Sequence, residues 1–347
     1  MTHNASPASP ADSPRGPGEH ILFAFGSARG GTTFLSSLLA RWFSYGMGPE
    51  GTFINDIVKL ANSIDDPTLE ANKRRLAQAV IATPTLQIIE KRWGDEHGFS
   101  VSTEEVMALM ARADAASAVY AAFDIMARKM NQARVGNKNP GYWRELDTLH
   151  NLFPDNARYL FIVRDGRDVA LSLREVPWGG HSTYTAARIW RNMVRTVAEF
   201  EGRLPAGRLL RIRYEDLLGD PVTTFRKIGE FVGQDDLDTL CTRYEQAAAE
   251  NRLQSNFDKW RQGMSARDQQ VYEAVAGEEL AQLGYARVYP QARLSLFSNA
   301  WYRLEEFLRK VKLNLYHRQD SLPLDARTSR RGLLVRLLQP GRYRKSG

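Results

Sequence analysis

The sequence has little of several features that would place it in familiar classes of protein. Its 347 residues include one cysteine, Cys241, so no disulfide can form within the chain and we expect a protein of the reducing cytoplasm. No apolar run is long enough to span a bilayer. Residues 1–18 are rich in Pro, Ala and Ser and lack the apolar segment of a signal peptide, which predicts a disordered leader. His97 and His150 are isolated and have no metal-ligand spacing, so we expect no metal site.

The net charge of +7 is unevenly distributed. Residues 291–347 contain 13 Lys or Arg and 4 Asp or Glu, which leaves the preceding residues with a net charge of −2. Two apolar helical patterns, at 301–315 and 333–338, lie within this basic extension, and such amphipathic segments bind anionic membrane surfaces. Peripheral membrane contact through residues 297–340 is therefore one expectation. Packing on the core or on a second subunit of a homodimer is the alternative. Nucleic acid is not an expected partner, because the extension has no recognisable binding fold.

A glycine-rich segment, residues 26–33, follows the apolar run of residues 21–25 and has the spacing of a phosphate-binding P-loop. Such a loop surrounds a phosphate with backbone N–H groups at the N-terminus of a helix, and the apolar positions of residues 34–42 predict that helix. Nucleoside triphosphatases need a lysine where this chain has Thr32, so ATP hydrolysis is not expected. The alternative is an ordinary glycine-rich turn. The candidate phosphate contacts are Arg29, Gly30, Gly31, Thr32 and Thr33.

A second strand pattern, residues 159–163, is followed directly by Arg164. Because parallel strands deliver binding groups from their carboxyl ends, Arg164 is predicted to lie near the P-loop. Together with Ser172 on the following helix, it is a candidate for binding a second phosphate. We interpret the intervening Asp165 and Asp168 as residues that orient the arginines or cap the helix, and Arg167 as their exposed partner.

With these two motifs, the chain resembles the P-loop sulfotransferases, which use 3′-phosphoadenosine 5′-phosphosulfate, over about residues 20–285. Residues 137–140 and 152–154 are similar to the corresponding segments of protein-tyrosine sulfotransferases and of related bacterial and carbohydrate enzymes, and residues 211–217 resemble the family's next strand. The resemblance implies a three-layer α/β fold with a central parallel sheet, formed by residues 19–290. A basic helical extension, 291–347, would follow it.

The resemblance also implies roles for individual residues. The P-loop would bind the 5′-phosphosulfate, Arg164 and Ser172 would bind the 3′-phosphate, and Tyr214 would lie near the adenine. Glu50 would act as general base toward an acceptor hydroxyl, while Lys138 and Arg29 would stabilise the transferring sulfuryl group without a metal. The alternatives are a solvated glutamate and a surface lysine. The family's late basic loop corresponds to residues 251–260 but lacks the Arg-Lys-Gly triplet, and the candidate contacts there are Arg252, Ser255 and Lys259.

Residues 53–131 contain no recognisable chemistry and are expected to form a helical insert on the acceptor side. Within them, Ser102 and Glu105 form a capping-box pattern that predicts a long helix through Leu109 and Met110. The acceptor is not identified; a glycan, lipid or small molecule is preferred over peptide tyrosine. Two other functions stay open: a P-loop nucleotide kinase, which Thr32 disfavours, and a catalytically silent nucleotide-binding or membrane-docking protein. The expected location is the cytoplasm, where the protein could also contact the inner face of a membrane peripherally.

Overall fold

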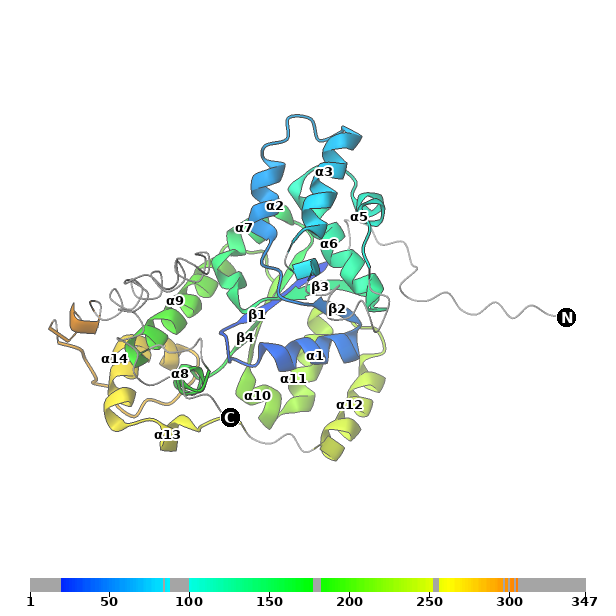
Figure 1. Cartoon of the computed structure of the whole chain (residues 1–347). Helices are drawn as coiled ribbons and strands as arrows, with labels where there is room; N and C mark the ends of the chain where they lie inside the picture. The colour runs from blue at the N-terminus through cyan, green and yellow to red at the C-terminus, as the bar shows by residue number, and fades with distance from the viewer. Residues whose placement is uncertain are drawn as a thin grey trace, which may run out of the picture.

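The structure, a computed structural model, describes residues 20–83, 85–87, 100–176, 182–251 and 256–304, the last range without 296, 299 and 303. The strands are β1 (Ile21–Gly26), β2 (Tyr45–Gly48), β3 (Arg134–Lys138), β4 (Ala157–Val163) and β5 (Leu209–Arg213). The helices are α1 (Thr32–Phe43), α2 (Ile54–Ala61), α3 (Glu70–Ile81), α5 (Thr103–Leu109), α6 (Ala115–Lys129), the 3-10 helix η2 (Pro140–Arg144), α7 (Leu146–Leu152), α8 (Gly166–Arg174), α9 (Thr183–Glu201), α10 (Tyr214–Gly219), α11 (Pro221–Phe231), α12 (Leu237–Asn251), α13 (Trp260–Gly263) and α14 (Ala266–Gln282). Figure 1 shows the strands in the centre of the molecule with helices on both sides.

The strands form one parallel five-stranded sheet in the order β2-β3-β1-β4-β5. The chain begins at the central strand β1, builds the β2 and β3 side, and then crosses to the β4 and β5 side. Ligands of open parallel sheets bind outside the carboxyl ends of the strands at such a switch point. The register places Gly26 of β1 opposite Ile162 of β4, so the loops after these two strands leave the same edge of the sheet.

Alternate residues of β1 enter two separate cores, one on each face of the sheet. On one face, Phe23 packs edge-on against Tyr142 of η2, with ring centroids 5.5 Å apart, in a core that also includes α6, α7 and α9. On the other face, Leu22 and Ala24 join residues of α1, α10 and α11. Helices therefore cover both faces, and the expected three-layer α/β fold with a central parallel sheet is confirmed.

The local elements predicted around the glycine-rich segment are present. β1 ends at Gly26, and α1 begins at Thr32. The apolar stripe of α1 faces the sheet, with Leu35 and Leu39 fully buried. This strand, loop and helix hold residues 27–31 at the switch point of the sheet.

The segment before α6 differs in part from the expectation. The Ser102 side chain accepts a hydrogen bond from Glu105 N (3.2 Å), and the Glu105 carboxylate accepts one from Ser102 N (2.8 Å), so the predicted capping box is confirmed. The long helix predicted after it is wrong, because α5 ends at Leu109 after seven residues. Met110 takes an extended backbone conformation and buries its side chain in the core. Tertiary packing of this kind overrides a local helical pattern.

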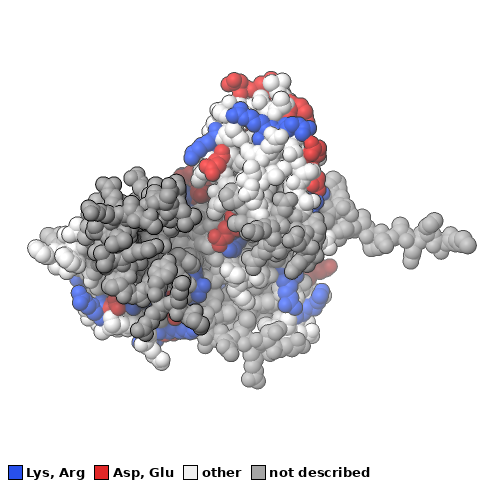
Figure 2. Space-filling view, in the orientation of Figure 1, with Lys and Arg blue, Asp and Glu red and all other residues white. Residues whose placement is uncertain are grey.

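Helices α2, α3, α5 and α6 occupy the region in which a helical insert was predicted. Figures 1 and 2 show α2 and α3 at the top of the molecule, where basic and acidic side chains alternate on this face. Exposed ion pairs such as Arg74–Glu104 account for this pattern. The predicted limits of the insert, 53–131, and of the extension, 291–347, stay predictions, and the leader lies outside the described residues. No helix in the described part of the chain combines the length and apolar content needed to cross a membrane.

A buried ion cluster lies beneath the loop that follows β4. Arg167 was predicted to be exposed, but it is 1% exposed, and its guanidinium donates hydrogen bonds to Asp165 Oδ2 (2.7 Å) and Glu273 Oε1 (2.8 Å). The same group stacks on Trp260 at 3.5 Å from the ring centroid. The prediction failed because helices α13 and α14, far along the chain, cover the loop. Asp165 does cap α8, since its side chain accepts a hydrogen bond from Arg167 N.

We expect Arg167→Leu to lower the free energy of unfolding by about 3–5 kcal/mol, because it leaves the carboxylates of Asp165 and Glu273 buried without their cation. Chemical denaturation of the variant and the parent protein measures this loss. The control is Arg203→Leu, whose ion pair with Asp147 is largely exposed on both sides. It should change stability by less than about 1 kcal/mol. Equal losses in the two variants would contradict the role of the buried cluster.

Candidate active site

The P-loop ends in a helix N-terminus that lacks a side-chain cap. Gly30 N donates to Ser27 O (2.9 Å), and Gly31 takes a left-handed conformation (φ 95°) that turns the chain into α1. No acidic residue lies in the first turn of α1, and no side chain accepts from its backbone N–H groups. The hydroxyl of Ser27 is buried and has no hydrogen-bond partner in the described structure. Free N–H groups at a helix N-terminus form a ready-made anion site.

Arg29 connects the P-loop to α8. Its backbone is left-handed (φ 65°), and its Nε donates to Ser172 Oγ at 3.0 Å. Its carbonyl oxygen accepts from Arg164 Nη1 at 3.1 Å. The sequence assigned Arg29 to the P-loop phosphate, and Arg164 with Ser172 to a second phosphate remote from the first; in the structure these hydrogen bonds link the two groups of residues.

Arg164 is a buried cation at the carboxyl end of β4, 5% exposed. Its guanidinium donates to Asn256 O, lies 3.6 Å from Asp168 Oδ2, and sits over the ring of Tyr214 at 4.8 Å from the centroid. Its Nε is buried without a hydrogen-bond partner among the described residues. Burial raises the pKa of the Asp168 carboxyl, and the N–H of Trp260 and the Arg164 guanidinium act in the opposite direction.

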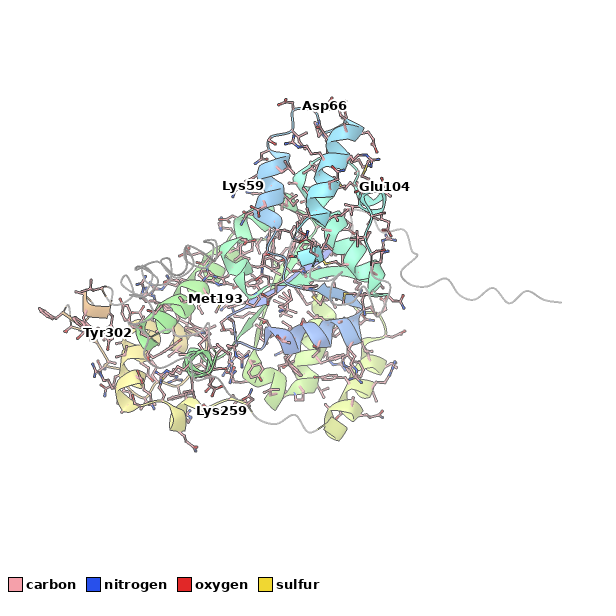
Figure 3. All side chains as sticks on the ribbon, in the orientation of Figure 1. Lys59, Asp66, Glu104, Met193, Lys259 and Tyr302 are labelled. Atoms are coloured by element: carbon pink, nitrogen blue, oxygen red, sulfur yellow. The ribbon has the colours of Figure 1, made fainter. Side chains whose placement is uncertain are left out.

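These groups line a cavity of about 320 Å³, here called the Arg164 cavity. Lys259 lies on its wall just before α13, as Figure 3 shows, and Asn256 is a lining residue that the sequence did not single out. Arg252 and Ser255, two predicted contacts, lie outside the described residues. The described lining is Arg29, Gly31, Thr32, Thr33, Arg164, Asp168, Leu171, Ser172, Glu175, Tyr214, Asn256 and Lys259.

Glu50 and Lys138 form an ion pair, with Lys138 Nζ 2.8 Å from Glu50 Oε1. Lys138 is the last residue of β3, and Glu50 follows the neighbouring strand β2, so the parallel pairing of these strands brings the two side chains together. The Lys138 side chain is 13% exposed and that of Glu50 is 47% exposed. The carboxylate is therefore accessible from solvent, while the cation behind it is nearly enclosed.

The loop that carries Glu50 is held by a buried amide that the sequence did not identify as functional. Asn137, fully buried in β3, donates through Nδ2 to Pro49 O (2.9 Å) and accepts at Oδ1 from Gly51 N (3.2 Å). The hydroxyl of Tyr142 donates to the same Oδ1 at 2.6 Å. These bonds fasten the backbone on both sides of Glu50. An asparagine within a strand was the available signal, because strands are depleted of Asn and buried amides require partners.

A second cavity, of about 520 Å³, is here called the Glu50 cavity. Its walls come from the P-loop, Glu50, residues 139–144, α8 and α9, and Figure 3 places Met193 of α9 in the middle of the molecule. The two cavities share Arg29, Thr32 and Thr33. The site is thus one crevice with two compartments that meet at the P-loop. No described residue in 53–131 is among the residues that line either cavity, and the prediction that this segment caps the acceptor side stays a prediction.

Several solved structures are similar to this chain. The sulfotransferase domain from the curacin biosynthetic pathway is 20% identical over 78% of this chain and 99% of that domain, with a TM-score of 0.44. Sulfotransferase STF9 from Mycobacterium avium is 15% identical over 80% of each chain, with a TM-score of 0.42. Mouse sulfotransferase SULT7A1, solved with PAP, is 12% identical over 78% of this chain and 87% of that chain, with a TM-score of 0.43.

No curated protein sequence gives a significant match to the chain. The sequence model of the sulfotransferase family matches residues 22–238, more than half of the chain. This range contains the P-loop, the Glu50–Lys138 ion pair, Arg164 and Tyr214, and so includes most of the crevice just described. The protein is therefore an enzyme of the sulfotransferase family.

Proposed function

We propose that this sulfotransferase takes its sulfuryl group from 3′-phosphoadenosine 5′-phosphosulfate and transfers it to the hydroxyl of a glycan, a lipid or a small molecule, with Glu50 as general base. The observation that carries the proposal is the crevice in which the Arg164 cavity and the Glu50 cavity meet at the P-loop. Such an arrangement lets a donor and an acceptor approach one reacting centre from opposite sides. The kinase alternative is set aside because the chain belongs to the sulfotransferase family.

The Arg164 cavity fits a donor with two separated anionic groups. At one end, the uncapped N-terminus of α1 offers backbone donors to the 5′-phosphosulfate, and the unpartnered hydroxyl of Ser27 lies in the adjoining Glu50 cavity. At the other end, Arg164 Nε and Ser172 Oγ are available to the 3′-phosphate, and the ring of Tyr214 offers an apolar face to the base. Lys259 lines the same cavity and adds positive charge. The requirement for 3′-phosphorylation follows from Arg164, because a buried cation favours a charged partner.

In the proposed reaction the acceptor oxygen forms a bond to sulfur while the bond from sulfur to the oxygen of the 5′-phosphate breaks. The acceptor proton goes to the Glu50 carboxylate, and the products are a sulfate monoester and adenosine 3′,5′-bisphosphate. Lys138, Arg29 and the amides of α1 stabilise the charge on the transferring group, the task that lysine and magnesium perform in nucleoside triphosphatases. The protein therefore contributes mainly position and fixed charge.

The donor assignment predicts a preference for adenosine 3′,5′-bisphosphate over ADP in calorimetric titrations without magnesium. We expect about 10- to 100-fold tighter binding, since a hydrogen bond to a charged group contributes about 1.5–3 kcal/mol. Ser172→Ala and Arg164→Lys should reduce this preference, with folding checked by thermal melting. Arg261→Ala, an exposed neighbour paired with Asp258, should leave it unchanged. Equal binding of the two nucleotides by the parent protein would refute the assignment.

The assignment of Glu50 predicts a selective loss of turnover. With any acceptor that the parent protein sulfates, Glu50→Gln should lower kcat by about 10²- to 10⁴-fold, the usual contribution of a general base. The affinity for adenosine 3′,5′-bisphosphate should stay within about threefold, because Glu50 does not line the Arg164 cavity. Glu199→Gln, an exposed change on α9, serves as the matched control. A kcat unchanged in Glu50→Gln would remove Glu50 from the mechanism.

The C-terminal residues of the described structure present an apolar surface. Phe297 is 89% exposed, Trp301 65% and Leu304 49%, and their spacing of four and three residues places them on one face of a helical segment. Tyr302, labelled in Figure 3, stacks on Tyr184 of α9 with ring centroids 5.0 Å apart. The segment is thus anchored on the enzyme by one face and exposes apolar side chains on another.

We propose that this surface contacts an anionic membrane, with homodimer formation as the alternative. Most of the predicted contact range, 297–340, lies outside the described residues, but its sequence carries the excess of positive charge that attracts anionic lipid. Exposed apolar side chains next to basic residues are typical of membrane-surface segments. A hydroxyl-bearing lipid acceptor would be presented at the same surface.

In sedimentation with phosphatidylcholine vesicles, the protein should bind when phosphatidylglycerol is included and lose binding as salt increases. The double variant Phe297→Ser, Trp301→Ser should bind several-fold less, because about 25 cal/mol is lost per Å² of apolar area no longer buried. Leu69→Ser, which removes an exposed apolar side chain next to α3, is the control. Absence of binding combined with a concentration-dependent dimer in light scattering would favour the homodimer.

A further inference from the structure

The Glu50 cavity has one polar end and one apolar wall. The polar end is the P-loop with Glu50, where transfer is proposed to occur. The wall formed by α8 and α9 consists of apolar side chains, namely Val169, Leu173, Ala186, Ile189, Trp190 and Met193. The indole N–H of Trp190 donates to Arg164 O (3.0 Å) and is not available to a ligand. A sugar bound here would place hydroxyl groups against a wall without hydrogen-bond partners, which is unfavourable.

One charge in this cavity has no role in the proposed transfer. Arg144, the last residue of η2, also lines the cavity and is exposed to solvent. Its guanidinium lies over the ring of Trp143, 4.0 Å from the centroid. Among the described residues, no carboxylate forms a salt bridge with it, although Glu145, the next residue, interacts with it electrostatically. The other cations near the reacting centre are engaged, Arg29 with Ser172 and Lys138 with Glu50.

The ring of Trp143 covers one face of the Arg144 guanidinium, whose N–H donors lie along its edge. A planar guanidinium binds a carboxylate through two parallel hydrogen bonds, and stacking on an aromatic ring holds it in a fixed plane. The cavity volume of about 520 Å³ is in the range that encloses a small organic molecule. The compartment therefore combines a carboxylate, an apolar wall and the Arg144 cation, which forms no salt bridge among the described residues.

We propose that the acceptor is an apolar alcohol or phenol that carries a carboxylate, with Arg144 binding the carboxylate while the hydroxyl faces Glu50. The inference rests on the proposed function, because it names the substrate class of the same site. The apolar body of the acceptor packs between Trp143 and the α8–α9 wall, which excludes water from the reacting hydroxyl. Arg144 is in this view a specificity-determining residue, and it takes no part in the transfer itself.

The test uses matched probes and the full-length protein loaded with adenosine 3′,5′-bisphosphate. The probes are 3-(4-hydroxyphenyl)propionate and 12-hydroxydodecanoate, each compared with its uncharged amide, and binding is measured by calorimetry. We expect the better acid to bind about 10- to 100-fold more tightly than its amide, the effect of a charged hydrogen-bonded pair. Arg144→Gln should reduce the affinity for the acid to that for the amide and leave the amide unchanged. Arg144→Lys should retain part of the preference.

The control variant is Arg74→Gln, which removes an exposed arginine of α3. Equal affinity of acid and amide for the parent protein, binding of no probe, or a preference that survives in Arg144→Gln would each overturn the inference. Failure of the donor assignment is distinguishable from these outcomes. If the donor assignment fails, the protein will show no preference for adenosine 3′,5′-bisphosphate over ADP. The preference for acid over amide can be measured separately on the nucleotide-free protein, where its dependence on Arg144 tests the inference.

Discussion

The contacts of the buried Arg164 guanidinium are the interactions on which the rest of the site depends. Its guanidinium donates to the carbonyl oxygens of Arg29 and Asn256 and lies over the ring of Tyr214, so one side chain joins the P-loop, the loop before α13 and the start of α10. A buried charge is unfavourable unless it is paired. The carbonyl dipoles and Asp168 offset part of this cost, and Nε stays without a partner. In the proposed function, Arg164 is thus held in position before the 3′-phosphate binds, which reduces the reorganisation that binding requires.

A small number of contacts also positions Glu50, the residue that we propose as the base. Glu50 is in a loop, and loops alone place side chains imprecisely. The amide of Asn137 removes that freedom by bonding to the backbone on both sides of Glu50, while Lys138, the next residue of the same strand, contacts the carboxylate. The positions of Glu50 and Lys138 are therefore fixed by strand β3 of the central sheet. The Glu50 cavity is lined by the segment that follows, since η2 comes directly after β3 and carries Arg144.

The part of the site that could be predicted from the sequence follows from short-range patterns. An apolar run, a glycine-rich turn and a helical stripe are contiguous, so β1, the P-loop and α1 were predictable together. The parallel pairing of β1 and β4 is long-range, but it follows from a general rule of doubly wound sheets, which placed Arg164 beside the P-loop correctly. The capping box of α5 was equally local. The length of α5 could not be predicted locally, because the helix ends before Met110, whose side chain packs in the core.

The sequence by itself determined the fold class, the sulfotransferase resemblance and the position of the segments that we propose to bind phosphate, because each depends on residues close together in the chain. Only the tertiary structure decided which polar side chains are buried and what they contact. The partners of Arg167 and Asn137 come from segments far along the chain: Glu273 of α14 pairs with Arg167, and the backbone of the loop after β2 bonds to Asn137. The position of Arg144 in the lining of the Glu50 cavity is likewise set by the packing of η2, α8 and α9. Burial and pairing are set by segments far apart in sequence, and no local pattern records them.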